Sequence, residues 1–435
     1  MNKETKRNKN NMAHIVIKNV GPIKNVELDL NKVNVFMGPQ SSGKSTIAKI
    51  ISYCSWYEKN VILTSKLSKD FYKDLLEFHN LEDNYFSADS FIEYKSNNCH
   101  IVFPGKDVEK LEVKATVGTD NVFLNEKIEY IPAERNFVTI KGIGKYNESR
   151  NNILGFLYDW FEAKREWTDK QYLFPIKSLD NVSYNYDLYN DIDNIILKSG
   201  TPIGLNHASS GLMSITPLLI VFDYMTTIVY NKKRIQSPFE IINIQSKIEN
   251  LDKEIKEQII ELKSKLDNLQ SYLDKNNAAP FTQQDIDKIQ NSLNKAIGID
   301  SDYNYSKIII EEPELNLFPD TQKDLIYYML SVLNEEKKEH QLVLTTHSPY
   351  ILFSLNNCMM GGLVKDKIPE QKHKGFESSH AWINPKKVSI YEIHDGTLKC
   401  IQDEDGIIED NYLNQAYKDN SAEYLSLLNY YGNEE

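Results

Sequence analysis

The 435-residue sequence has few cysteines, no excess of positive charge and no apolar N-terminal segment, and each absence excludes a class of protein. Its four cysteines, Cys54, Cys99, Cys358 and Cys400, lie far apart, without Cys-x-x-Cys or Cys/His ligand spacing. This favours reduced thiols and argues against a zinc ribbon or a disulfide framework. The net charge of −12 argues against a broadly basic, sequence-independent nucleic-acid binder and leaves only a local basic patch open.

The N-terminus is basic and polar, so it lacks the apolar core of a signal peptide. We expect residues 1–12 to form a disordered tail, with Met12 as an alternative start. One apolar stretch, 212–230, approaches the length of a membrane span, but it contains Pro217 and Asp223. These residues favour a buried core helix. The sequence therefore predicts a cytoplasmic protein that does not bind a membrane.

Residues 38–46 form a complete Walker A phosphate loop, GPQSSGKST, between a short apolar strand and the start of a helix. Gly38 and Gly43 allow the backbone to turn its N–H groups toward a phosphate, and Lys44 can reach the β- and γ-phosphates. Ser45 can hold Mg²⁺, and the helix N-terminus adds positive potential. The pattern predicts a nucleoside triphosphate site made by Gly38, Gln40, Ser41, Ser42, Gly43, Lys44, Ser45 and Thr46.

Two apolar runs, 307–310 and 341–344, are typical of strands buried on both faces of a parallel sheet. The first leads to Glu311, expected to hold Mg²⁺ directly or through water, and to Glu312, expected to act as general base toward the attacking water. The second leads to His347, which the sheet edge would place near the γ-phosphate. Glu312 and His347 are the predicted catalytic residues.

Between these motifs, Ser209, Ser210 and Gly211 form a small-residue loop that opens an apolar helix. Serine hydroxyls, a glycine backbone and a helix N-terminus together make a second anion-binding surface. We refer to Ser209–Ser210–Gly211 as the signature loop.

Further strands are predicted at 14–18, 24–30, 100–103, 111–117 and 127–131, a helix near 71–78, and a C-terminal hairpin made by 388–393 and 397–401. Residues 150–230 are predicted to be mainly helical, with a turn region near 180–191. Within 236–300, apolar residues recur at heptad spacing with a break at 276–280, which predicts a protruding helical hairpin. Its longer arm packs on a partner chain or on the parent domain, and the pattern leaves both open.

In this order, the four motifs resemble those of ABC-type ATPases. The segments GPQSSGKST, ASSGLMS, IIIEEPELNLFP and LTTHSPYIL are most similar to the OLD/SMC-like branch, often labelled AAA family ATPases. IKNVGPIKNVELDL, YIPAER and VSIYEIHDGTLKCI are similar to that branch as well. The resemblance implies an ABC-ATPase-like P-loop α/β fold with a mixed or parallel central sheet, an antiparallel β subdomain and a coiled-coil hairpin insertion. The expected division is a tail, 1–12; a first ATPase part with Walker A and the signature loop, 13–235; the insertion, 236–300; and a second ATPase part with Walker B, the switch histidine, the β-hairpin and a helical tail, 301–435.

The resemblance also implies a composite site. Lys44, Ser45 and Thr46 of one protomer would hold ATP and Mg²⁺, and Ser210 and Gly211 of a second would close over the γ-phosphate. Departures from the family pattern are Gln40 in place of Asn, Phe318 in place of the His of Leu-His-Pro, and no identifiable Q-loop glutamine. Glu134 and Arg135 are interpreted either as neighbours of the site or as a structural salt bridge.

The segment after His347 is too short for the Toprim nuclease domain of OLD proteins, and the acidic run 403–406 is expected in a turn, so we expect no nuclease activity. ATPases of this form resemble components of antiphage systems such as PARIS and Septu. The sequence thus predicts an ATPase whose ATP-dependent homodimer, or higher homo-oligomer, controls a separately encoded effector, a nuclease or toxin. The alternatives are an SMC-like DNA repair clamp, disfavoured by the acidic charge and short hairpin, and an ATP-bound scaffold, disfavoured by Glu312. Direct nucleic-acid binding stays open.

Overall fold

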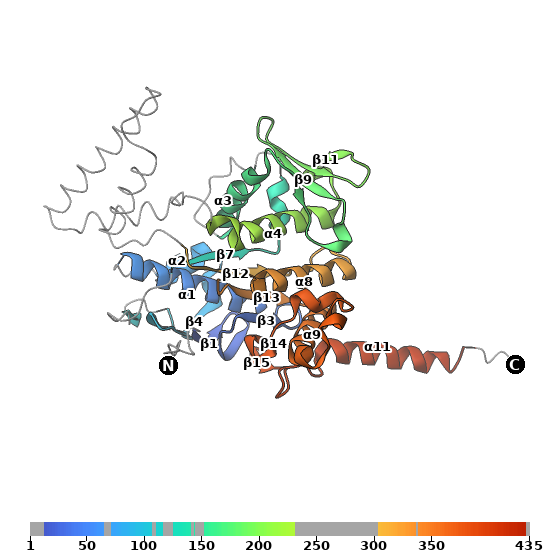
Figure 1. Cartoon of the computed structure of the whole chain (residues 1–435). Coiled ribbons are helices and arrows are strands. Elements are labelled where there is room, and N and C mark those ends of the chain that lie inside the picture. Colours follow the sequence, from blue (N-terminus) through green and yellow to red (C-terminus); the bar gives the residue numbers. More distant parts are fainter. Residues whose placement is uncertain are drawn as a thin grey trace, which may run out of the picture.

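The computed structural model describes residues 13–64, 71–106, 110–115, 125–140, 143, 152–230, 303–335 and 338–431. The predicted N-terminal tail, 1–12, and the predicted helical hairpin, 236–300, lie outside the described residues. The remaining elements form a layered α/β body, from which the C-terminal helix projects (Figure 1).

One large sheet has the strand order β6-β5-β4-β1-β2-β15-β14-β3-β13-β12-β7. Its strands are β1 His14–Val20, β2 Ile23–Asp29, β3 Val33–Met37, β4 Phe86–Lys95, β5 Cys99–Pro104, β6 Glu112–Ala115, β7 Glu126–Ile131, β12 Tyr305–Glu311, β13 Gln341–Thr346, β14 Val388–His394 and β15 Thr397–Cys400. The strands from β14 to β7 are mutually parallel, whereas β6 to β2 pair antiparallel. The sheet is therefore mixed, with the phosphate-loop strand β3 inside its parallel half.

The parallel half is buried on both faces, which explains its continuous apolar runs. In β12, Ile308 and Ile310 face one hydrophobic core, and Ile309 between them faces a second. The same alternation in β3 puts Val35 and Phe36 on opposite faces. Two cores enclosing one sheet fix the register of these strands, because a shift by one residue would exchange every side chain between the cores.

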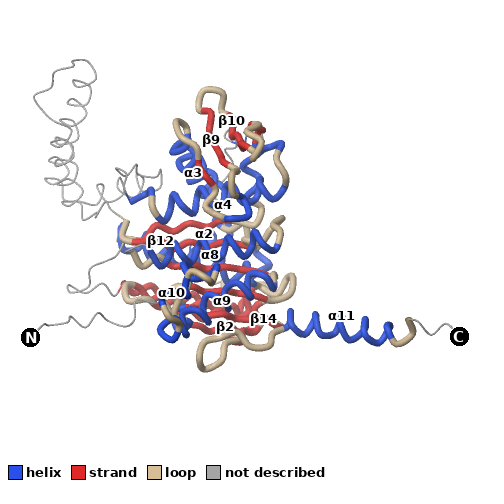
Figure 2. The backbone as a smooth tube through the Cα atoms, turned by 45° about the vertical axis from the view of Figure 1, so that its right-hand side comes forward, coloured by secondary structure: helices blue, strands red, loops and turns tan. Residues whose placement is uncertain are grey.

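The helices are α1 Lys44–Thr64, α2 Phe71–Phe78, α3 Asn152–Lys164, α4 Ser210–Thr226, α8 Pro319–Glu335, α9 Pro349–Val364, α10 Glu370–His373 and α11 Tyr412–Leu428. Buried residues of α1 and α2 belong to the core that contains Ile309. Buried residues of α3, α4, α8 and α9 belong to the other core. Figure 2 shows the strands between these helices and α11 extending away from them.

Residues 172–204 differ from the helical prediction. They form a four-stranded antiparallel sheet with the order β11-β10-β9-β8, made by β8 Tyr172–Leu173, β9 Ser183–Asp187, β10 Ile192–Ile196 and β11 Pro202–Gly204. The alternation of β9, in which Ser183 and Tyr184 are buried and Asn185 is partly exposed, is weak, and tertiary packing decided the outcome. Of the turn region predicted near 180–191, residues 180–181 and 188–191 form turns, whereas Ser183–Asp187 between them form strand β9.

Within the described residues, one helical stretch, Ser210–Tyr230, is long and apolar enough to cross a membrane, and 72% of the tested window is buried inside the protein. Such burial is typical of a core helix. The strands predicted at the N-terminus, in the middle of the chain and in the C-terminal hairpin are present. The predicted α/β fold class, with a mixed central sheet and an antiparallel β subdomain, is confirmed, and the coiled-coil insertion that completes the prediction lies outside the described residues.

Candidate functional site

The phosphate loop follows β3 and leads directly into α1. Gly38 has φ +154° and Gly43 φ +106°, and Ser41 between them has φ +59°. A Cβ atom at Gly38 would lie 2.6 Å from the carbonyl oxygen of Ile393, and one at Gly43 would lie 2.3 Å from Cδ1 of Ile23. The two glycines are thus required by the backbone conformation and by packing against β14 and the β1–β2 turn.

Lys44 is mostly buried, and its Nζ donates hydrogen bonds to the carbonyl oxygens of Gly38 and Pro39, each at 2.8 Å. Burial lowers the pKa of Lys44, and the nearby carboxylates of Glu312 and Glu314 oppose that shift. The ammonium group therefore lies inside the loop and beside acidic groups, where it can contact a phosphate.

Strand β12 ends at Glu311, which is buried, and Oε1 of this carboxylate is buried without a hydrogen-bond partner. Glu312 follows in the left-handed region, with φ +43°, and its N–H donates to the carbonyl oxygen of Thr345 at 3.0 Å. Its side chain is 30% exposed. A buried, unsatisfied carboxylate oxygen next to a partly exposed carboxylate fits a metal ligand beside a group in contact with water.

His347 lies at the end of β13 beside these carboxylates. Its Nδ1 is 3.4 Å from Oε1 of Glu312 and 3.7 Å from Oε1 of Glu314. The side chain is 39% exposed, so the imidazole is accessible from the sheet edge. The parallel pairing of β12 with β13, and of β13 with β3, brings Glu312, His347 and the phosphate loop to one edge.

Glu314 is a residue that sequence analysis did not assign. It is buried, and its Oε1 accepts hydrogen bonds from Oγ1 of Thr346 at 2.8 Å and from the N–H of His347 at 2.9 Å. The carboxylate thereby fixes the loop that carries the histidine. A third acidic residue after Glu311 and Glu312 was the available signal.

The signature loop lies at the start of α4. Ser209 is its N-cap, with Oγ accepting from the N–H of Leu212 at 3.4 Å, and Ser209 and Ser210 are exposed. A Cβ atom at Gly211 would lie 2.9 Å from the backbone oxygen of Asn316, so this end of α4 packs against the turn after Glu312. The two serine side chains remain available at the surface of the chain.

Arg135 is fully buried in the 3₁₀ helix Arg135–Thr139. Its guanidinium donates hydrogen bonds to backbone carbonyl oxygens, among them those of Ser214, Glu311 and Glu312. Of the two interpretations offered by the sequence, a position near the site therefore fits, whereas a salt bridge to Glu134 is not among these contacts.

A cavity of about 380 Å³ adjoins the phosphate loop. It is bounded by three segments far apart in sequence: the β1–β2 turn with Pro22 and Lys24, the loop residues 39–42, and the turn 393–396 of the C-terminal hairpin. The N–H of Lys24 donates to the carbonyl oxygen of Gly396 at 2.8 Å, which joins the first and third segments. The volume is within the range of small-molecule sites.

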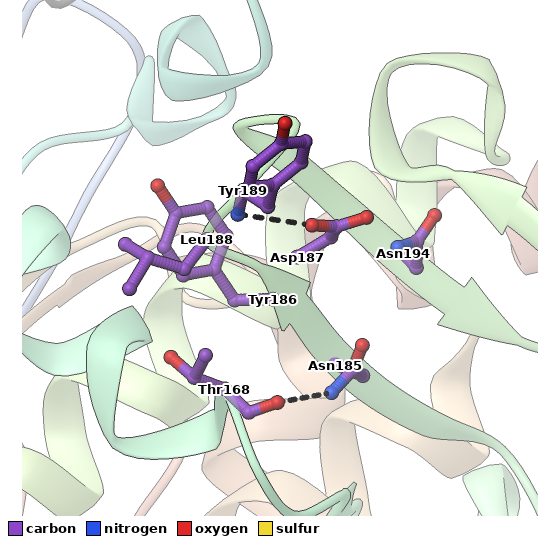
Figure 3. Close-up of a pocket in the computed structure, with 7 residues that line it drawn as sticks. All are labelled: Thr168, Asn185, Tyr186, Asp187, Leu188, Tyr189 and Asn194. Atoms are coloured by element: carbon purple, nitrogen blue, oxygen red, sulfur yellow. Dashed lines mark hydrogen bonds between the residues drawn. The ribbon is translucent and has the colours of Figure 1, made fainter.

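A larger cavity of about 610 Å³ lies in the antiparallel subdomain (Figure 3). It is lined by Thr168, residues 185–189 and Asn194. Asp187 is the one acidic side chain of this lining, and it accepts from the N–H of Tyr189 at 3.0 Å. The cavity has no residue of the predicted site, so the smaller cavity is the candidate for a nucleotide.

The sequence matches two family models. Residues 14–298, more than half of the chain, match the model described as AAA domain, and residues 298–352 match the one described as AAA ATPase domain. A search of curated proteins found no match.

Several solved structures are similar. The SMC head domain from Thermotoga maritima has 8% identity and a TM-score of 0.35, covering 90% of this chain and 99% of that one. The Smc head domain with an extended coiled coil, bound to the C-terminal domain of ScpA, from Pyrococcus furiosus has 10% identity and a TM-score of 0.33, with coverages of 90% and 95%. The recombination mediator protein RecF has 10% identity and a TM-score of 0.28, with coverages of 90% and 99%.

Proposed function

The chain belongs to the AAA domain family, an ATP-binding ATPase domain, and from this premise we propose that it hydrolyses ATP at the edge formed by the phosphate loop, Glu312 and His347. The observation that carries the proposal is the convergence of Lys44, Glu312 and His347, which lie far apart in sequence, at the carboxyl ends of adjacent parallel strands. Ligands of open α/β sheets bind at such edges.

In this proposal, the N–H groups of the loop and Lys44 bind the β- and γ-phosphates, and the nucleoside enters the 380 Å³ cavity. Ser42 supports this placement, because its Oγ is buried in the loop without a hydrogen-bond partner. Gln40 and Ser41 line the mouth of the same cavity.

The hydroxyl of Ser45 and the carboxylate of Glu311 are the groups that would hold Mg²⁺, and the unsatisfied Oε1 of Glu311 fits this role. The metal would supply neutralisation of charge on the phosphate oxygens. Hard oxygen donors of this kind are those that Mg²⁺ prefers.

Glu312 is the proposed general base. Its carboxylate accepts a proton from a water molecule as the water oxygen bonds to the γ-phosphorus, and the bond from that phosphorus to the β,γ-bridging oxygen breaks, which releases ADP and phosphate. His347, 3.4 Å from this carboxylate, is placed to donate a hydrogen bond to a γ-phosphate oxygen. Glu314 holds the backbone of His347 in that position.

The second half of the site is proposed to come from another copy of the chain. Ser209 and Ser210 are exposed at the N-terminus of a helix whose following turns are buried. Exposed hydroxyls and N–H groups at a helix start bind anions well. Placed against the γ-phosphate of a partner's ATP, they would make ATP binding and dimerisation one event, and hydrolysis would reverse it.

Two substitutions test the site, and a third serves as a control. Lys44→Ala is expected to abolish ATP binding, measured by calorimetry, because it removes the cation inside the loop. Glu312→Gln is expected to bind ATP, lose turnover by about 10²-fold or more, and accumulate an ATP-bound dimer in size-exclusion chromatography with light scattering. Glu370→Gln, on the exposed helix α10, is the control for loss of an acidic charge. Hydrolysis by Glu312→Gln at the wild-type rate would show that the base is misassigned.

Ser210→Arg tests the contribution of a second copy. Its bulk and charge are expected to prevent closure and turnover while ATP still binds to the monomer. Ser199→Arg, at an exposed serine in the β10–β11 turn, is the matched control. Unchanged turnover by Ser210→Arg would contradict the composite site.

We further propose that the ATP-dependent dimer controls a separately encoded effector, in the manner of antiphage systems. The support is the resemblance of the motifs to such ATPases. Co-expression with the product of an adjacent gene, with and without Lys44→Ala, tests it: an ATP-dependent complex is expected. Stimulation of turnover by double-stranded DNA, with no such complex, would instead favour a DNA clamp.

A further inference from the structure

Arg135 uses every N–H of its guanidinium on backbone carbonyl oxygens. Nε donates to Ser214 at 3.0 Å; Nη1 donates to Pro132 at 3.3 Å and Glu311 at 2.9 Å; Nη2 donates to Glu312 at 3.0 Å and Pro313 at 3.3 Å. A guanidinium has five N–H donors in a rigid planar fork, and all five are engaged. The side chain is fully buried.

Three of these carbonyl groups belong to the consecutive residues Glu311, Glu312 and Pro313. They converge on one cation, and the left-handed conformation of Glu312, at φ +43°, is part of the turn that directs them there. A non-glycine residue in this region is strained by about 1–2 kcal/mol and persists only where the surroundings hold it. Arg135 is the group that holds the backbone on both sides of the Glu312 side chain.

The fourth contact, from Nε to Ser214, reaches the first turns of α4, shortly after the signature loop. Beside the bond from Nε to Ser214, the side-chain amide of Asn316 donates to Oγ of Ser214 at 3.0 Å. Asn316 is itself left-handed, with φ +62°, and its carbonyl oxygen lies against Gly211. The start of α4 and the turn after β12 are therefore joined at three points: through Arg135, through the bond from Asn316 to Ser214, and through the packing of Gly211 against Asn316.

We propose that Arg135 is a positioning residue for Glu312 and that it connects the signature loop of one protomer to the general base of the same protomer. The proposal rests on the proposed function, because it assigns Arg135 a part in that reaction. A signature loop that engages a partner's ATP would then set the position of its own Glu312. The two composite sites of a dimer would be coupled through this connection.

The positive charge suits the role. Burial lowers the pKa of Arg135 to about 10, but the carboxylates of Glu314, Glu312 and Glu311 favour its charged form, so the group stays protonated at neutral pH. Lysine could keep the charge, but its single nitrogen has three donors and cannot span five carbonyl groups on three segments. Arg135→Lys therefore separates geometry from charge.

Arg135→Lys is expected to lower kcat about 30-fold or more while the Kd for a non-hydrolysable ATP analogue changes less than about threefold, because a general base contributes about 10²–10⁴-fold and the phosphate loop is untouched. In a Glu312→Gln background, the same change is expected to add less than about threefold, because Arg135 acts through Glu312. If Arg135→Lys lowers kcat by the same factor with and without Glu312→Gln, the positioning role is overturned.

A structural readout tests the proposal independently of hydrolysis. In hydrogen–deuterium exchange, Arg135→Lys is expected to increase exchange both in 312–316 and in the first turns of α4, but not in 38–46. Unchanged exchange in either of the first two segments would overturn the connection, even if the wild-type protein does not hydrolyse ATP. Absence of wild-type hydrolysis would count against the proposed function alone.

Two further variants separate the role from simple loss of stability. Asn316→Gly keeps a residue that tolerates φ +62° and removes only the bond to Ser214, and kcat is expected to fall about 3- to 10-fold without loss of ATP binding. Lys164→Met removes a buried cation that pairs with Asp193 in the antiparallel subdomain, and it is expected to lower thermal stability but leave kcat unchanged. Loss of kcat in Lys164→Met equal to that in Arg135→Lys would assign the effect to stability.

Discussion

Asp223 of α4 makes the stability of the protein depend on pH in a calculable way. The carboxyl group accepts hydrogen bonds from the hydroxyls of Tyr172, at 2.6 Å, and Tyr328, at 2.7 Å. These two bonds join the antiparallel subdomain and α8 to α4, the helix that begins at the signature loop. Burial raises the pKa of Asp223 from 3.8 to about 6, and the two hydroxyls reduce the shift only in part.

Because the folded-state pKa is raised, the folded protein binds the proton more tightly than the unfolded chain does. The free energy by which protonated Asp223 stabilises the folded protein is fully present below pH 3.8 and is lost as the pH rises through about 6. A difference of this size corresponds to about 3 kcal/mol of free energy of unfolding, of which about 1.4 kcal/mol is lost between pH 5 and 7.5. Asn cannot titrate, so Asp223→Asn is expected to lack this loss.

The assay is urea denaturation of both proteins at pH 5 and pH 7.5, followed by circular dichroism. Relative to the wild type, Asp223→Asn should gain about 1.4 kcal/mol between the two pH values. Asp187→Asn is the control, because hydrogen bonds from Asn190 hold the pKa of Asp187 below 3.8, outside the window. Equal pH dependence for the wild type and Asp223→Asn would refute the reasoning.

Two other predictions follow from single contacts, and a third follows from the exposure of α11. Gly211→Ala is expected to lower turnover at least about fivefold with ATP binding retained, because its Cβ would displace α4 from the neighbouring turn. Gly155→Ala in α3 is the control, because open space surrounds the new Cβ. Equal activity of the two variants would contradict the packing argument. Glu314→Gln, which keeps an oxygen acceptor for the N–H of His347, is expected to retain more activity than Glu314→Ala, and equal losses in steady-state assays would assign the role to charge instead. Deletion of residues 414–435 is expected to change the thermal midpoint by less than about 2 °C, because no residue of α11 is buried, and a larger drop by calorimetry would reveal an unrecognised contact.

The parallel half of the sheet could be predicted because its signals are local. Strand, glycine-rich loop and helix lie next to one another in 33–64, and the apolar runs of β12 and β13 are typical of strands buried on both faces of a parallel sheet. The resemblance implied an antiparallel subdomain, but the sequence pattern did not locate strands within 172–204, because they are short, carry many polar residues and owe their conformation to packing against α3 and α4. Asp187 and Asp191 marked the turn between two strands that the pattern itself did not reveal.

The residues of the candidate site likewise fall into those that the sequence could assign and those that it could not. Lys44, Glu312 and His347 could be named from sequence, because each belongs to a motif whose chemistry depends on residue type and spacing. Arg135 and Glu314 could not be assigned roles, because their function lies in hydrogen bonds to backbone groups up to 178 residues away. Every residue has a backbone carbonyl group, so the sequence of the partner segment does not indicate which residue accepts such a bond.

The sequence by itself determined that a phosphate loop, a carboxylate pair and a histidine follow one another on buried strands, since those features depend on nearest neighbours in the chain. Only the tertiary structure decided that β14 lies beside β3, so that the C-terminal hairpin closes one side of the phosphate loop. It also decided that the buried guanidinium of Arg135 joins α4 to the turn that carries Glu312. Such convergence depends on sheet order and burial, which are set by the packing of the whole chain around two cores.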